Sequence, residues 1–363
     1  MDRVSENRVT MQFDTSGIMN LDSALEVQAA EFGKIREAVR RLSFQPVDPV
    51  GMYAAVAYKA IDGGKLGITF DPFELELVNV ADSYGNDLLK FLMPKRREFT
   101  PNDFAFMDDL PPVREFLDGL GYSSVSDACQ LQMLNSVGRA MELAELAVIT
   151  TRITLNPNEP VVVMRDGLLR FPFLKREAKG RLLDLLRRHP RQVLVGVAKS
   201  SRVLSLTGAA MLVEKTFPPN STGHVEVPEE LERMAYKWVP GSLGFPLGNL
   251  HVAKLSARNR LLVTVEVPHD RANDRRVYSR QQVGEIFGHL IKDSAASFPT
   301  LGYPQTLMRA HEKAVRTGFA ASVWRDKVLG CLLEKVGDPS IVAQLKETWM
   351  LREYIKSPYL GGT

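Results

Sequence analysis

Two apolar runs separated by a basic segment limit the folds open to this chain more than any other feature. The first run is VVVMRDG at 161–167, and the second is QVLVGVAKSS at 192–201. Continuous apolar runs of this length predict strands covered on both faces, as parallel strands of α/β proteins are. The segment between them, KREAKGRLLDLLRRH at 175–189, has the periodicity of a basic amphipathic helix. We therefore expect two parallel strands joined through a helix.

Three β-prone runs precede this unit and extend the predicted sheet. They are MYAAVAYKAID at 52–62, KLGITF at 65–70 and ELELVNVAD at 74–82, separated by GG and by DPF. The separators are typical of tight turns, and strands joined so closely must be antiparallel. A long helical segment at 128–153 follows. The predicted order is three antiparallel strands, helix, strand, helix, strand, which is a mixed α/β sheet with helices on both faces.

Helices dominate the two ends of the chain, and a further hairpin is expected at 251–268. An apolar seam along 21–42 predicts a helix that docks on its own domain or contacts a partner; it consists of Leu25, Gln28, Phe32, Ile35, Val39 and Leu42. Late helices are expected at 279–295 and 305–317, with two more in the last 40 residues. We expect an N-terminal helical segment at 1–50, a central α/β domain at 51–321 and a C-terminal helical extension at 322–363.

Composition narrows the class of protein. Of 363 residues, 45% are hydrophobic and 25% charged, a globular balance that provides a sizeable core. The apolar runs are far shorter than the roughly 20 residues of a membrane span, so we expect a soluble, cytoplasmic protein. Cys129 and Cys331 match no metal or redox spacing. A net charge of +3 permits nucleic-acid binding without requiring it.

Asp62 and Asp166 each end an apolar strand and precede glycine, in AIDGG and VMRDGLL. Either Asp-Gly pair alone is typical of a turn. The predicted element order, however, fits the ribonuclease H-like sheet, in which these two strands are neighbours. Their carboxylates would then face each other across one strand spacing, roughly 5 Å. A divalent cation relieves the repulsion between carboxylates this close.

A third acid and a histidine are available to complete such a site. Glu142 and Glu145 lie on nearly the same face of the long helix, and either could also be a solvated glutamate. We favour Glu145, because Leu143, Leu146 and Ile149 bracket it, and keep Glu142 as the alternative. His311, in LGYPQTLMRAHEKA, fits the fourth place, with His289 as its rival on a late helix. An imidazole ligand shifts the preferred ion away from Mg²⁺ and toward Mn²⁺.

Four motifs, in this order, resemble those of the NurA nucleases, the partners of the HerA hexameric translocase. They are AIDGG, VVVMRDGLL, VGVAKSS and GYPQTLMRAHEKA, and the resemblance covers roughly residues 52–321. It implies a ribonuclease H-like core, Mn²⁺-dependent cleavage of DNA and a homodimer. The implied site residues are the metal ligands Asp62, Glu145, Asp166 and His311, with Tyr303 near the scissile phosphate and Lys199 as a basic residue for DNA. The family writes Asp-Gly-Ser at both acidic motifs, whereas this chain has DGG and DGL.

We therefore expect a metal-dependent DNA nuclease acting on single strands or duplex ends, with Mn²⁺ as cofactor and Mg²⁺ as the alternative. Catalysis would depend on Asp62, Glu145, Asp166, Tyr303 and His311. The chain has no G-x-x-x-x-G-K-[ST] motif, so a HerA-type ATPase would supply translocation, in DNA end processing or phage defence. The alternatives are a non-catalytic ribonuclease H-like adaptor that binds a translocase or DNA, and a nuclease that works without a motor.

Overall fold

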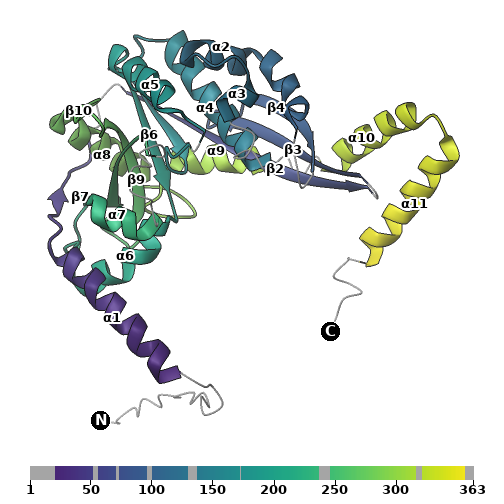
Figure 1. The fold of residues 1–363 in the computed structure, drawn as a ribbon. Coiled ribbons are helices and arrows are strands. Elements are labelled where there is room, and N and C mark those ends of the chain that lie inside the picture. The colour runs from purple at the N-terminus through teal and green to yellow at the C-terminus, as the bar shows by residue number, and fades with distance from the viewer. Residues whose placement is uncertain are drawn as a thin grey trace.

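One mixed sheet organises the molecule (Figure 1). The computed structural model describes residues 21–51, 56–70, 73–95, 100–129, 137–171, 173–236, 246–315 and 321–355. In these residues ten strands form the sheet, in the order β1-β7-β8-β9-β6-β5-β2-β3-β4, with β10 paired to β9. The strands are β1 (Gln45–Pro46), β2 (Ala57–Phe70), β3 (Phe73–Asp82), β4 (Asp87–Pro94), β5 (Val161–Asp166), β6 (Gln192–Ala198), β7 (Gly223–Glu226), β8 (Gly248–Lys254), β9 (Val263–Asp270) and β10 (Arg275–Arg276).

Five of these strands give the sheet its ribonuclease H-like arrangement. β2, β3 and β4 form an antiparallel meander, while β5 pairs parallel to β2 and β6 parallel to β5. The meander's first strand therefore lies at the centre, directly beside the strand that follows the long helix. This is the order expected from the sequence, and it confirms the predicted fold class. β9 then adds antiparallel to β6, and the β8–β9 hairpin is confirmed.

The strand boundaries predicted for the meander were wrong. β2 runs unbroken through Gly63 and Gly64, and the third strand is β4, which follows a turn at 83–86. Helices approach both faces of β2 closely at these two glycines. A Cβ on Gly63 would overlap the Glu145 carboxylate, and one on Gly64 would overlap the backbone carbonyl of Ala314. The glycines therefore serve close packing rather than a turn.

Helices cover both faces of the sheet, as predicted. One face packs against α2 (Pro111–Leu120), α4 (Val137–Leu155) and α5 (Arg176–Arg188), and the other against α8 (Arg280–Ser294) and α9 (Gln305–Val315). Alternate residues of a strand point to opposite faces. Ile61 and Val163 accordingly join the first core, while Ala60 and Met164 join the second. We call these the α4 face and the α9 face.

The terminal helices extend away from the sheet (Figure 1). In α1 (Leu21–Arg40), Ile35 and Val39 are buried in a core with α6 (Arg202–Val213), whereas Leu25 is 56% exposed. The predicted seam thus docks on its own domain only along its second half. α10 (Ala321–Val336) buries Val328 and Leu329 against β2 and β3, and α11 (Pro339–Ile355) follows it.

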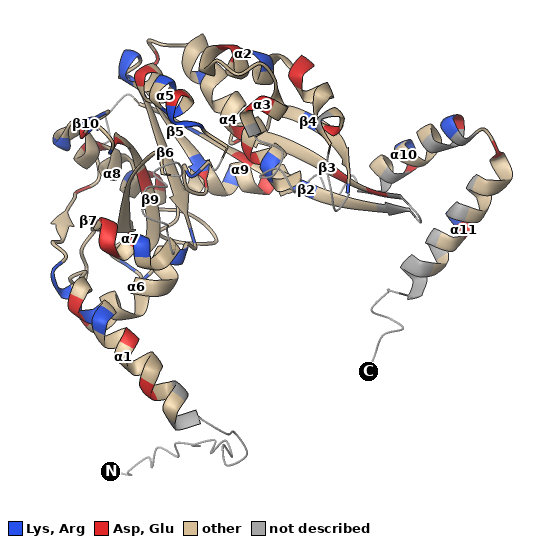
Figure 2. Ribbon diagram, viewed as in Figure 1, with Lys and Arg blue, Asp and Glu red and all other residues tan. Residues whose placement is uncertain are grey.

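The remaining short helices fill the connections. They are the 3₁₀ turns η1 (Pro101–Asp103) and η2 (Ala105–Asp109), with α3 (Val125–Cys129) and α7 (Glu229–Tyr236). Among the helices in the described ranges, none has the length and apolarity needed to cross a membrane. Acidic and basic residues share the outer helices, as α1 and α5 show (Figure 2). A ligand site is therefore better sought in local geometry than in the overall charge.

Candidate metal centre

Strand register places two aspartates side by side on the α9 face. Ile61 of β2 pairs with Arg165 of β5 in a parallel ladder, so the next residues, Asp62 and Asp166, are neighbours too. Because Ile61 points to the α4 face, both aspartates point to the α9 face. The side chain of Asp62 is buried, and that of Asp166 is 16% exposed. Two acids thus meet where β5 ends.

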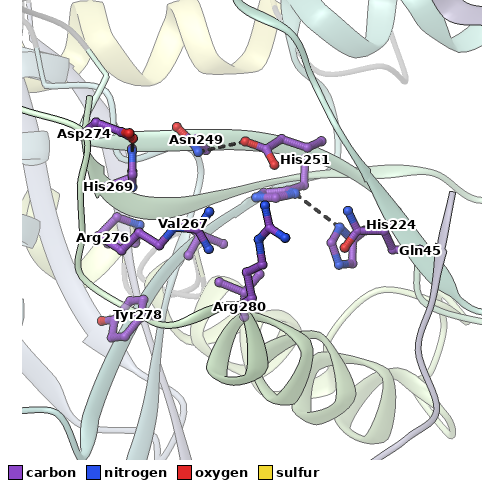
Figure 3. Close-up of a pocket in the computed structure, with 13 residues that line it drawn as sticks. Gln45, His224, Asn249, His251, Val267, His269, Asp274, Arg276, Tyr278 and Arg280 are labelled. Atoms are coloured by element: carbon purple, nitrogen blue, oxygen red, sulfur yellow. Dashed lines mark hydrogen bonds and ion pairs between the residues drawn. The ribbon is translucent and has the colours of Figure 1, made fainter. Parts of the chain in front are cut away.

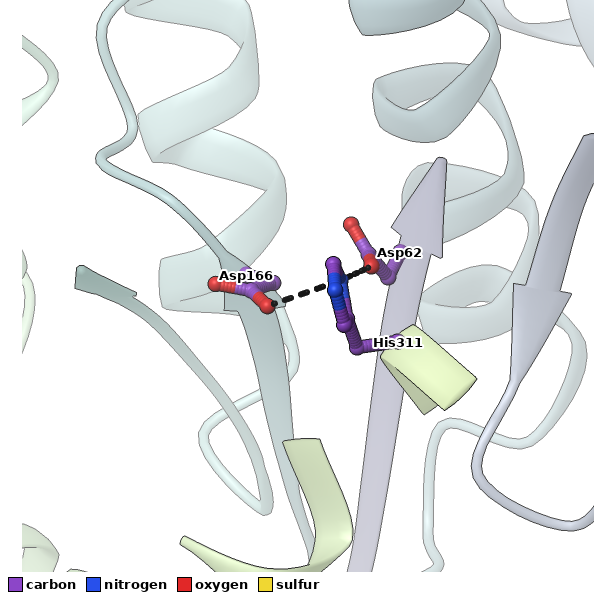
Figure 4. A group of neighbouring side chains, drawn as sticks. All are labelled: Asp62, Asp166 and His311. Carbon is purple, nitrogen blue, oxygen red and sulfur yellow. Dashed lines mark hydrogen bonds and ion pairs between the residues drawn. The ribbon is translucent and has the colours of Figure 1, made fainter. Parts of the chain in front are cut away.

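His311 reaches this pair from α9 (Figure 4). Its Nδ1 lies 2.8 Å from Asp62 Oδ2 and 3.6 Å from Asp166 Oδ2. One ligand atom from each of the three residues lies within 4.8 Å of the others. The imidazole is half exposed, which leaves the group open to solvent on one side. A late helix therefore closes a site whose acids stand far earlier in the chain.

Two carboxylates lie close together in this group, with His311 and Lys199 as the nearby basic groups. Burial raises the pKa of Asp166, and the charge of Asp62 raises it further. The hydrogen bond to Asp62 raises the pKa of His311. The charge of Asp62 contributes to both shifts, and a bound cation would relieve the repulsion between the two carboxylates. Two carboxylates and an imidazole are a donor set that suits a divalent transition ion, so the residues present fit a metal.

Tyr303 and Lys199 contact Asp166 from the side. The Tyr303 hydroxyl donates a hydrogen bond to Asp166 Oδ1 at 2.8 Å, and its ring is fully buried. The Lys199 ammonium lies 3.9 Å from Asp166 Oδ2 and 4.6 Å from the centre of the tyrosine ring, and its side chain is 43% exposed. Tyr303 therefore orients the carboxylate, while Lys199 stands at the open side of the site.

Glu145 lies on the opposite face of the sheet and outside this group of three. Its side chain is buried toward the sheet, as predicted, but it projects from α4, and Arg165 Nε donates to its Oε2 at 2.8 Å. Burial raises the pKa of Glu145 to about 7, against the opposing effect of Arg165. Glu142, the alternative, pairs with Arg139 at 2.6 Å on the same helix. The structure thus brings together Asp62, Asp166 and His311, and holds the helix glutamates elsewhere.

The sequence interpretation overlooked Arg165. A charged residue inside the run VVVMRDG was the available signal, because a buried strand carries an arginine only where an acid meets it. His289, the rival histidine, accepts or donates one hydrogen bond with Tyr58 at 3.0 Å. In the described residues, only Asp62, Asp166 and His311 form a three-residue group with metal-binding spacing.

A second polar hollow lies between β7, β8, β9 and the start of α8 (Figure 3). His224 and His251 share a hydrogen bond there, with their Nδ1 atoms 3.2 Å apart, and His224 stacks on Phe287 at 3.8 Å. Burial lowers the pKa of His224 to about 4, so the imidazole is neutral. The lining also includes two acids and two arginines: Glu226, Asp274, Arg276 and Arg280. Glu226 accepts a hydrogen bond from Asn249 and Asp274 pairs with His269, so each acid already has a partner in the protein.

Comparison with known proteins gives only distant similarity. No family model matches the chain, and no curated protein matches it. The NurA nuclease from Sulfolobus solfataricus is similar, with 12% identity over 87% of this chain and 95% of that one, at a TM-score of 0.47. A structure of NurA with manganese is 7% identical over 88% of this chain and 98% of that one, at a TM-score of 0.42.

A structure of endonuclease V from Streptomyces avermitilis shares 13% identity over 83% of this chain and 94% of that one, at a TM-score of 0.28. NurA nucleases, which the four sequence motifs resemble, are thus among the structures to which this chain is similar. TM-scores below 0.5 assign nothing by themselves. The fold assignment therefore rests on the strand order, and the candidate site on its own geometry.

Proposed function

We propose that this chain is a metal-dependent nuclease that hydrolyses phosphodiester bonds in DNA, at single strands or duplex ends. The observation that carries the proposal is the convergence of Asp62, Asp166 and His311 on one face of a ribonuclease H-like sheet. Mn²⁺ is the proposed ion, because an imidazole joins the carboxylates and because a similar NurA structure contains manganese. Mg²⁺ is the alternative.

The site residues have distinct tasks in this proposal. Asp62, Asp166 and His311 would hold the cation, which when bound lowers the pKa of water and offsets charge on the phosphate. Tyr303 occupies Asp166 Oδ1, so Oδ2 is the oxygen turned toward His311. The exposed ammonium of Lys199 is placed to attract a phosphate group. His311 must be neutral to bind a metal.

Partners also belong to the proposal. A HerA-type hexameric ATPase would feed DNA to the nuclease, which would work as a homodimer in the cytoplasm. Two features support a role in assembly: the first half of α1 exposes Leu25 and Val27, and α11 exposes Ile341 and Leu351. Exposed large apolar residues on projecting helices are typical of contact surfaces. End processing or phage defence is the setting that the resemblance suggests.

Cleavage of labelled DNA tests the proposal. The purified full chain is incubated with linear duplex and single-stranded DNA, with Mn²⁺, with Mg²⁺ or with a chelator. We expect cleavage with Mn²⁺ that the chelator abolishes and that Asp62→Asn removes. Asp184→Asn is the matched control, because Asp184 is an exposed acid on α5 that pairs with Arg187. An unaffected Asp62→Asn variant would refute the site, and an inert wild type that retains translocase binding would favour the adaptor.

Addition of a HerA-type ATPase tests the partner. We expect co-elution with the chain and faster cleavage in the presence of ATP. Cleavage that is neither stimulated nor accompanied by co-elution would show a nuclease that works without a motor.

A further inference from the structure

Arg165 stands directly before Asp166 in β5 and points to the opposite face of the sheet. Its side chain is only 8% exposed, and its Nε donates to Glu145 Oε2 at 2.8 Å. One terminal nitrogen donates to the backbone carbonyl of Leu168, and the guanidinium lies 4.8 Å from the centre of the Phe171 ring. A charge this deeply buried is tolerated because each of these contacts compensates it.

The hydrogen bond from Arg165 to the Leu168 carbonyl spans the turn that carries Asp166. Arg165 and Leu168 flank Asp166 and Gly167, and Gly167 has a φ of 116°, which favours glycine. A Cβ at Gly167 would lie 3.1 Å from Arg165 Nη1, so the guanidinium packs against this turn. Tyr303 holds the Asp166 carboxylate itself from the other face. The backbone and the side chain of Asp166 are therefore fixed from opposite sides.

The same pairing removes Glu145 from the metal site. The carboxylate lies against Gly63 on the α4 face, whereas Asp62 and Asp166 point to the α9 face. Its nearest positive charge is Arg165, which already satisfies Oε2. The charge of Arg165 offsets that of Glu145, which weakens the attraction of this carboxylate for a cation. Among the residues that the structure describes, three ligands then remain for metal: Asp62, Asp166 and His311.

We infer that the site binds one divalent cation. A second cation would need Glu145 as a free ligand, and Glu145 instead forms a pair with Arg165 that positions the turn of Asp166. Arg165 supplies a fixed positive charge behind the turn, and Glu145 anchors that charge to α4. The inference deepens the proposed nuclease function, on which it rests for the identity of the reaction. The metal count itself can be measured without DNA.

Titration calorimetry with Mn²⁺ alone tests the ligand set. We expect one ion per wild-type chain, and a Kd at least about 100-fold weaker in Asp62→Asn. Glu145→Gln should still bind one ion, with a Kd weakened only about tenfold, because it disturbs a residue that positions a ligand and not a ligand itself. Glu159→Gln is the matched control, because Glu159 pairs with Arg152 at the far end of α4. Two ions per wild-type chain, or a Glu145→Gln variant as weak as Asp62→Asn, would overturn the inference. So would the same loss in Glu142→Gln.

Hydrogen exchange tests the positioning role. In the double variant Glu145→Gln/Arg165→Gln, which leaves no unpaired buried charge, amide exchange at 166–169 should rise at least about tenfold. The Glu159→Gln control should leave exchange in this segment unchanged, and thermal melts identify any variant that has lost its fold. Glu145→Gln alone tests the role again if the double variant does not fold. Unchanged exchange at 166–169 in a folded variant would overturn the positioning role.

The two proposals can fail separately. A wild type that binds one Mn²⁺ ion but cleaves no DNA would refute the nuclease function and leave the metal count intact. A wild type that cleaves DNA and binds two ions would support the nuclease function and refute the inference of a single cation.

Discussion

Two histidine-bearing clusters lie on the same sheet, and they differ in how their charge is compensated. In the hollow beside α8, His224 and His251 bond to each other, and the two acids of the lining bind Asn249 and His269. In the group at the end of β5, two aspartates face a single imidazole, and the pKa values of Asp166 and His311 are both raised. Two close carboxylates that open to solvent, rather than the presence of histidine, therefore mark a site for an added ion.

The two faces of β2 and β5 also differ in the partners of their acids. Glu145 on the α4 face is buried but paired with Arg165, whereas Asp62 and Asp166 on the α9 face repel each other. The α9 face opens to solvent through the half-exposed His311, whereas Glu145 on the α4 face is buried. Four experiments, from the largest expected effect on DNA cleavage to the smallest, test whether this contrast holds.

Asp166→Asn should have the largest effect. The substitution removes one of two carboxylates that would hold the cation, and the amide cannot replace its charge. We expect cleavage to fall on the order of 1,000-fold, or about 4 kcal/mol of transition-state stabilisation. Single-turnover rates on end-labelled DNA measure it. A loss under about tenfold would mean that Asp166 is not a metal ligand.

His311→Ala should have a smaller effect. It removes the exposed ligand but leaves both acids, so we expect Mn²⁺ affinity to fall by at least about 100-fold, the upper end of the loss typical of a residue that only hydrogen-bonds a ligand, with a comparable loss of cleavage at limiting metal. His289→Ala, on α8, is the matched control and should leave both quantities unchanged. Equal losses of Mn²⁺ affinity in the two variants would contradict the assignment of His311, and not His289, as the metal ligand.

Tyr303→Phe should reduce cleavage by about tenfold, because it removes one hydrogen bond to a charged carboxylate. Since the ring remains, the fold should survive, which a melting curve verifies. The loss should fall on kcat at saturating Mn²⁺ rather than on KM for DNA, because the buried hydroxyl orients Asp166 and does not face DNA. A change confined to KM would instead place Tyr303 against the substrate.

His224→Gln should leave cleavage unchanged and alter only acid stability. In the folded protein the pKa of His224 is lowered from 6.5 to about 4, so its contribution is complete above pH 6.5 and is lost as pH falls toward 4. Over this range, each pH unit lowers the free energy of unfolding by up to about 1.4 kcal/mol. Glutamine does not titrate, so Tm should fall less on acidification than in wild type.

His189→Gln, at the end of α5, is the control for this acid-stability measurement and should retain the wild-type acid sensitivity. Equal acid sensitivity in His224→Gln and wild type would show that the histidine pair is not kept neutral by burial.

Much of the sheet could be predicted from the sequence, because its signals are local. The runs at 161–167 and 192–201 have no polar face, so they had to be covered on both sides, and Asp62 and Asp166 became neighbours once those strands were placed. The break predicted at Gly63 and Gly64 failed because glycine is used there for contact with two helices. Those contacts come from Glu145 and Ala314, which are 82 and 250 positions away in the chain by difference of the residue numbers.

The face on which a side chain lies could not be predicted in the same way. The spacing of apolar residues correctly indicated that Glu145 is buried toward the sheet. It carries no information on strand register, which decides that Arg165 and Glu145 share the face opposite Asp62. His311 was selected through the resemblance to a family, since 249 residues separate it from Asp62. Long-range partners of this kind depend on tertiary packing, which local pattern does not encode.

Anomalous X-ray scattering from crystals of the full chain grown with Mn²⁺ tests the central claim most directly. We expect one peak per chain, in contact with Asp62, Asp166 and His311, while Glu145 remains bonded to Arg165. A map without a peak at this group in saturating Mn²⁺ would contradict the metal centre. A peak in contact with Glu145 would contradict the separation of the two faces.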